Sequence, residues 1–165
     1  TLTISSYYLF DHVKKRISSF LDSGAETYQM DLSIKAFQSG GILGKGPGQG
    51  ILKERIPDAS TDFIFAVAGE ELGFVFCLII ILIILSIIIR TLIYVLKIQD
   101  PYKMIAISGL IFSFGLQSLI NIFSSIGLIP TKGMTLPFVS YGGSSMISIS
   151  ILFGFLLSLT NKNNA

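Results

Sequence analysis

The sequence predicts an all-α integral membrane protein, and we expect the chain to be a fragment of a polytopic helical bundle. Hydrophobic residues make up 51% of its 165 residues and charged residues only 13%, against about 25% in a typical soluble domain. Residues 72–89 carry no charge, and this stretch, which ends at Arg90, is long enough for one membrane span. The net charge of +2, without a basic cluster interleaved with aromatic residues, argues against nucleic-acid binding.

Polar and proline-containing segments separate the expected spans. Gln99, Asp100 and Pro101 interrupt the apolar pattern after the first full span, and two prolines stiffen the connection before the last one. The expected segments are the end of a transmembrane helix at 1–10, a large extracytoplasmic loop at 11–70, transmembrane helices at 71–96, 104–129 and 142–160, a cytoplasmic loop at 97–103, an extracytoplasmic loop at 130–141 and a cytoplasmic tail at 161–165.

The distribution of positive charge sets the expected sidedness. Arg90, Lys97, Lys103 and Lys162 lie beside the short loop and the tail, which the positive-inside rule assigns to the cytoplasm. The long loop also contains basic residues, but long loops follow that rule poorly. Because two spans return the chain to the same side, the long loop and Lys132 are expected to share the outer face.

A polar stripe runs along the expected second full span. Its residues recur every four positions, so they lie on one side of a helix. They are Gly109, Ser113, Gln117, Asn121 and Ser125. Polar groups in hydrocarbon need partners, so we expect this side to pack against protein or to line a cavity, and packing is the favoured interpretation.

Asp62 stands where the chain passes from polar loop to apolar span. Pro57 disfavours helix before it, and Asp58, Ser60 and Thr61 are good N-cap residues, which predicts a helix that starts close to Thr61. Asp62 would then lie in the first turn, where the helix dipole stabilises an ionised carboxylate. The same helical face would continue through the small residues Ala66, Gly69 and Gly73, against which another helix can pack closely.

A glycine-rich loop precedes this segment. Six glycines fall within residues 40–50, but neither the phosphate-loop pattern nor GxGxxG occurs in any register. Two interpretations remain for the loop. It is either a flexible connector or a wall that permits close backbone approach to a ligand, with Lys45 near the ligand's charge.

Two long motifs in this chain resemble signatures of the SEDS family (shape, elongation, division and sporulation). Residues 57–73 read PDASTDFIFAVAGEELG, and residues 130–145 read PTKGMTLPFVSYGGSS. Details such as Gly46-Pro47-Gly48 are more similar to the family's division branch, FtsW, than to its elongation branch, RodA. The departures are Asp58 for the usual Glu, Ser60 for the usual His and Ser23 for a usual Pro, so any role of that histidine does not transfer.

The resemblance implies a ten-helix fold of which this chain would hold the end of helix 7, the large outer loop and helices 8 to 10. It implies a peptidoglycan glycosyltransferase that polymerises lipid II beside a class B penicillin-binding protein and other divisome membrane proteins. The expected location is the bacterial inner membrane, with several spans, at the division septum. The family's essential loop aspartate corresponds to Asp62.

The chemistry of sugar transfer suggests roles for individual residues. An acceptor hydroxyl attacks an anomeric carbon while a lipid pyrophosphate leaves, which requires a base and balancing cations. Asp62 is the predicted catalytic base, and Lys132, Lys45, Thr131 and Ser140 are the predicted substrate-binding residues. No cofactor is assigned, although a divalent cation, Mg²⁺ or Mn²⁺, is an open alternative for the charge balance. The rival functions are a lipid II flippase and a scaffold that only activates the penicillin-binding protein.

Overall fold

The computed structural model describes residues 25–52, 56, 58–130 and 133–161. Its helices are α3 (Ala25–Gly40), α4 (Ile64–Val95), α5 (Pro101–Ser125) and α6 (Gly143–Thr160), and the described residues contain no strand. α4, α5 and α6 are each long and apolar enough to cross a membrane. The predicted all-α membrane fold is therefore confirmed. The expected helix end at 1–10 and the tail residues 162–165 lie outside the described residues.

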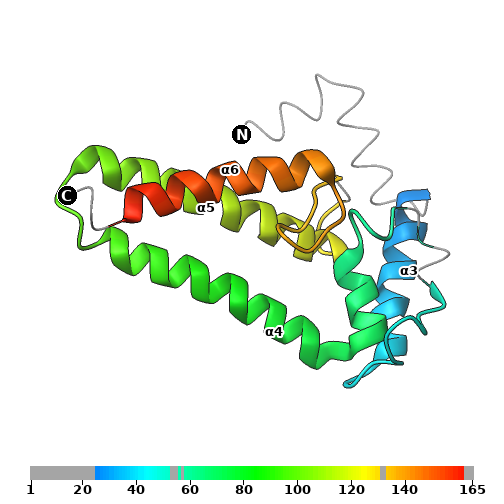
Figure 1. Ribbon diagram of the computed structural model, residues 1–165. Helices are drawn as coiled ribbons and strands as arrows, with labels where there is room; N and C mark the ends of the chain where they lie inside the picture. The colour runs from blue at the N-terminus through cyan, green and yellow to red at the C-terminus, as the bar shows by residue number, and fades with distance from the viewer. Residues whose placement is uncertain (1–24, 53–55, 57, 131–132, 162–165) are drawn as a thin grey trace, which may run out of the picture.

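The three long helices run alongside one another, with α5 in contact with both α4 and α6 (Figure 1). The turn between α4 and α5 lies at the same end as the last residues of α6. α3 and the connection between α5 and α6 lie at the opposite end. This arrangement brings the segment before α4 and the segment before α6 together, as the predicted two-span return requires.

The start of α5 follows directly from its sequence. Asp100 is the N-cap, and its Oδ1 accepts hydrogen bonds from the backbone N–H groups of Tyr102 at 2.9 Å and Lys103 at 3.4 Å. Pro101 occupies the first helical position, where its missing N–H costs nothing. The helix therefore starts at 101 and ends at 125, a few residues earlier at each end than the predicted segment 104–129, while α6 closely matches the predicted segment 142–160.

α4 begins inside the predicted loop and is broken at Gly73. Its first residue is Ile64, so residues that were assigned to the loop 11–70 are helical. Gly73 has φ 81 and ψ 177, which lies outside helical geometry and divides a short first part from the long part that follows. The chain turns sharply there, and only the long part corresponds to the predicted span 71–96 (Figure 1). Gly73 therefore breaks the helix instead of extending the small-residue face to its end.

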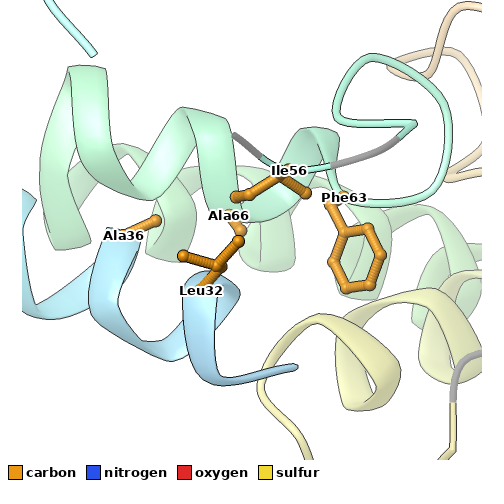
Figure 2. Close-up of a cluster of buried hydrophobic side chains, with 5 residues drawn as sticks. All are labelled: Leu32, Ala36, Ile56, Phe63 and Ala66. Atoms are coloured by element: carbon orange, nitrogen blue, oxygen red, sulfur yellow. The ribbon is translucent and has the colours of Figure 1, made fainter. Parts of the chain in front are cut away.

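α3 packs tightly against the short first part of α4 (Figure 2). Leu32 and Ala36 of α3 meet Phe63 and Ala66 in a buried cluster that also contains Ile56. Close approach is possible because Ala66 is small and because Gly69, one turn later, leaves room for a phenyl ring of α3. The predicted close packing of a second helix on this face is confirmed for Ala66 and Gly69.

The polar stripe of α5 is buried only at the end that faces the loops. Asn121 is 1% exposed and Ser125 is fully buried, whereas Gln117 is half-buried and Ser113 is exposed. The backbone carbonyl of Ser125 accepts a hydrogen bond from Ser33 of α3. In the described part of the chain, the predicted packing of this stripe is thus confirmed for the half of α5 nearest α3.

Candidate functional site

Asp62 lies in a turn that precedes α4. Asp58 adopts the left-handed conformation, with φ 55, and its carbonyl oxygen accepts the N–H groups of both Thr61 and Asp62 at 3.0 Å. The α4 N-cap is Phe63, which has no side-chain capping bond, and the first turn of the helix contains no acidic residue. The prediction that Asp62 lies in the first turn was therefore wrong. The turn closed by Asp58 delays the helix until Ile64.

The surroundings of Asp62 raise the pKa of its carboxyl group above the ordinary value. The larger cause is partial burial, which disfavours the charged form, and the smaller cause is the negative charge of nearby Asp58. This direction is opposite to the helix-dipole effect predicted from the sequence. A carboxylate with a raised pKa is a better proton acceptor, so the raised pKa strengthens the case for a general base.

The Asp62 turn is joined by hydrogen bonds to the connection between α5 and α6 and to α5 itself. The backbone N–H of Tyr141 donates to the carbonyl oxygen of Ser60 at 2.9 Å. The side chain of Asn121, on α5, donates to the carbonyl oxygens of Asp62 at 2.9 Å and Met134 at 2.6 Å. The two signature segments of the sequence, far apart along the chain, therefore meet at one place.

Gly133 brings this connection against the carboxylate itself. A Cβ atom placed on Gly133 would lie 3.5 Å from Oδ2 of Asp62, so the carboxylate faces the side of Gly133 that carries no side chain. Gly133 follows Lys132 directly in the sequence. Lys132 and Thr131 lie outside the described residues, and their roles in substrate binding stay predictions.

Ser140 closes a tight turn within the connection. It is buried, and its hydroxyl oxygen accepts the N–H of Leu136 at 2.8 Å, while its own N–H donates to the Leu136 carbonyl at 3.0 Å. Phe138, inside this turn, has a positive φ of 62. The observed role of Ser140 is thus to shape the backbone, and its predicted contact with substrate stays a prediction.

Lys45 is engaged by a residue that the sequence reasoning missed. Glu70 is fully buried, and its Oε1 lies 3.3 Å from the Lys45 ammonium. The same carboxylate accepts the backbone N–H groups of Ile51 at 3.1 Å and Leu52 at 3.1 Å. A sequence signal for Glu70 did exist, because it falls one helical turn after Ala66 on the face that packs against α3.

The glycine loop is consequently an ordered wrap around the first part of α4. The N–H groups of Lys45 and Gly46 donate to the carbonyl oxygens of Glu70 at 3.0 Å and Glu71 at 2.9 Å. A side chain at Gly44 would overlap the α4 backbone. The close backbone approach that one interpretation predicted therefore occurs, but its observed partner is the protein itself. A substrate contact of Lys45 stays a prediction.

A polar cavity adjoins the Asp62 site. It has a volume of about 390 Å³ and is lined mainly by hydroxyl and amide side chains from α5, the connection and α6. The lining residues are Gln117, Gly133, Met134, Thr135, Ser144, Ser145 and Ser148. Gly133 thus borders both this cavity and the Asp62 carboxylate. A second cavity, about 700 Å³ between α4 and α5, has an almost wholly apolar lining and no ionisable residue, so we place the candidate site at Asp62.

No set of acidic, histidine or cysteine side chains in the described ranges gathers into a group that could hold a metal ion. Asp58 and Asp62 are the two carboxylates at the site. The divalent cation stays a prediction.

Comparisons with known proteins identify the family. A family model for the FtsW, RodA and SpoVE proteins, described as cell cycle protein, matches residues 1–165. The chain belongs to this family. The SEDS resemblance is therefore confirmed.

Curated relatives of this family share more than a third of the sequence. The chain is 44% identical over 159 residues to the probable peptidoglycan glycosyltransferase FtsW of Caulobacter vibrioides, covering 96% of the chain and 41% of that protein. It is 37% identical to the FtsW of Geobacter metallireducens, described in the same words, over 92% of the chain and 42% of that protein. It is 36% identical to the peptidoglycan glycosyltransferase RodA of Mycobacterium bovis, over 96% of the chain and 34% of that protein. The chain thus spans less than half the length of these relatives.

A solved structure shares the fold. One chain from a study of how a peptidoglycan synthase complex coordinates polymerization and crosslinking matches with a TM-score of 0.75 and 23% sequence identity. The match covers 96% of this chain and 45% of that one. The SEDS arrangement of these helices, together with their apolar character, supports a multi-pass membrane protein.

Proposed function

We propose that this chain forms the catalytic portion of a peptidoglycan glycosyltransferase that polymerises lipid II into glycan strands, with Asp62 as the general base. The observation that carries the proposal is the position of the Asp62 carboxylate, which has a raised pKa and lies beside Gly133 in a turn that is hydrogen-bonded to α5 and to the second signature segment. The names of the relatives support the activity. The base accepts the proton of the acceptor hydroxyl as that oxygen attacks the anomeric carbon.

A single carboxylate suffices for this reaction. In inverting glycoside hydrolysis one carboxylate activates the nucleophile, and a separate acid is needed to protonate a poor leaving group. Pyrophosphate leaves readily, so the second requirement falls away. What remains is a cation for the developing negative charge, and Lys132, which precedes Gly133, is our candidate for it.

The other substrate contacts follow from the same placement. Thr131 and Ser140 belong to the segment that meets Asp62, and Lys45 belongs to the loop on the first part of α4. A divalent cation, Mg²⁺ or Mn²⁺, is the alternative charge balance. No step of the proposed reaction passes through such a cation.

The proposed setting is the bacterial inner membrane at the division septum. There the protein would work beside a class B penicillin-binding protein and other divisome membrane proteins. The fold match to a peptidoglycan synthase chain is compatible with such a partnership. The greater similarity to FtsW than to RodA favours division over elongation.

Polymerisation of purified lipid II by the full-length protein with its penicillin-binding partner tests the proposal. No other polymerase is present in such an assay, so a flippase or a pure scaffold would produce no glycan strands. We expect strands from the wild type and none above background from Asp62→Asn. Equal strand synthesis by both would end the assignment of Asp62 as the base.

A further inference from the structure

Asn121 lies beneath the contact between the Asp62 turn and the connection to α6. Its side chain is 1% exposed, and Nδ2 donates to the carbonyl oxygens of Asp62 at 2.9 Å and Met134 at 2.6 Å. An amide NH₂ group has two hydrogens, so it can serve one carbonyl with each. Because both partners are acceptors, the network selects this orientation of the amide over the flipped one.

We propose that Asn121 is a positioning residue, which holds the Asp62 turn and the 133–142 connection at a fixed separation. This inference rests on the proposed function, in which Asp62 is the base. Asn121 would act through the two backbones it binds and not by touching substrate. Asn121 lies on a regular, packed helix, and a helix is a more rigid support than a loop.

The geometry explains why this separation matters for the reaction. The carbonyl that Asn121 binds belongs to Asp62 itself, so the bond restrains the residue from which the carboxylate extends. Met134, the other bonded residue, follows Gly133, which lies beside that carboxylate. One α5 side chain thereby links the base to the segment that carries the proposed pyrophosphate contact.

Neighbours on the same stripe of α5 provide matched controls. Gln117, one turn earlier, donates from Nε2 to the Thr135 carbonyl at 3.1 Å and to the Thr135 hydroxyl at 3.3 Å. Both of these bonds therefore go to the connection and not to the Asp62 turn. Ser113, a further turn away, is exposed. Asn121 is thus distinguished from Gln117 by reaching both segments.

Disulfide trapping measures the docking of the two segments without any assay of activity. The pair Ser60→Cys and Tyr141→Cys suits this purpose, because both positions are exposed and a backbone hydrogen bond of 2.9 Å joins them. A disulfide requires two Cα atoms about 4.4–6.8 Å apart, so the rate of trapping reports how often the two segments come within that distance. The background is the full-length protein in membranes, with Cys77 and any other native cysteine replaced.

In this background, Asn121→Leu removes both donors while keeping a similar volume. Each net hydrogen bond contributes a factor of about five, so the loss of both should lower the rate of disulfide formation about 25-fold. Gln117→Leu and Ser113→Ala should leave that rate close to the parent value. If Asn121→Leu is not recovered as a folded protein, Asn121→Ser, which is small and uncharged, provides the same comparison.

The second arm measures lipid II polymerisation by the same variants without the cysteine pair. A misplacement of about 1 Å can cost about 10²-fold in rate, so kcat should fall by about that factor in Asn121→Leu while KM changes little. Unchanged trapping in Asn121→Leu would overturn the inference, and so would slower trapping with an unchanged kcat. If the wild type itself makes no glycan strands, the proposed function fails. The trapping rates then still show whether Asn121 holds the two segments together.

Discussion

The buried carboxylate of Glu70 should determine whether the glycine loop stays wrapped on α4, and Glu70→Gln tests this without changing side-chain volume. The carboxylate accepts two backbone N–H groups, those of Ile51 and Leu52, and pairs with Lys45. A hydrogen bond to a charged acceptor contributes about 1 kcal/mol more than a bond to a neutral one, so the two backbone bonds together lose about 2 kcal/mol. The Lys45 side chain is 34% exposed, so solvent screening limits its ion pair to at most about 1 kcal/mol.

Hydrogen exchange of a peptide that covers residues 44–52 measures this local loss directly. A decrease of about 2–3 kcal/mol in the free energy of loop opening corresponds to exchange about 30- to 140-fold faster. Glu71→Gln is the matched control, because it makes the same chemical change at the next residue. The Oε2 atom of Glu71 also accepts a loop hydrogen bond, from the Gly48 N–H at 2.9 Å, but in a more exposed setting. Equal acceleration in the two variants, or none in Glu70→Gln, would show that the buried carboxylate does not hold the loop.

Three further outcomes are expected. Gly73→Ala would force a methyl group into the backbone of the glycine loop at a residue whose φ is +81, so the thermal unfolding midpoint of this variant in detergent should fall clearly. Gly109→Ala is the control. It has open space around it, so its midpoint should be unchanged or higher. Burial and the charge of Asp58 both raise the pKa of Asp62, so the acid limb of the pH–rate profile should lie at a higher pH than an ordinary aspartate would give. Asp58→Asn should move this limb to lower pH. A limb that does not move would contradict the electrostatic coupling between the two carboxylates. Lys132→Ala should weaken lipid II use strongly and Lys132→Arg less so, and unchanged initial rates across lipid II concentrations in Lys132→Ala would mean that the lysine makes no phosphate contact.

The sequence was sufficient to predict the helices whose signals are local. Charge-free length predicted the long part of α4. Asp100 and Pro101, which start α5 as N-cap and first helical residue, were interpreted only as a break in the apolar pattern, although their signal is local. The four-residue repeat placed Asn121 and Ser125 on one face, and both are buried. Helical periodicity and capping act over a few residues, so a single sequence contains enough information to locate them.

The details of the site depended on contacts that no local pattern encodes. Asp58, Ser60 and Thr61 are all suitable N-caps, and the left-handed conformation of Asp58 decided against a helix at that point. The sequence predicted Gly73 as one more small residue on a packed helical face. In the structure the backbone of the glycine loop packs directly against Gly73, and the helix breaks there. Asp62 and Gly133 are neighbours although more than seventy positions separate them. The sequence predicted only that their two segments lie on the same face of the membrane.

The rate of glycan polymerisation by Asp62→Asn is the most direct test of the central claim. The full-length variant, with the proposed penicillin-binding partner and saturating lipid II, is compared with the wild type and with Asp31→Asn, which makes the same change at an exposed position on α3. A general base contributes about 10²–10⁴-fold in rate, so Asp62→Asn should lose activity by that range while Asp31→Asn keeps it. Near-normal strand synthesis by a correctly folded Asp62→Asn protein would contradict the role of Asp62 as the base.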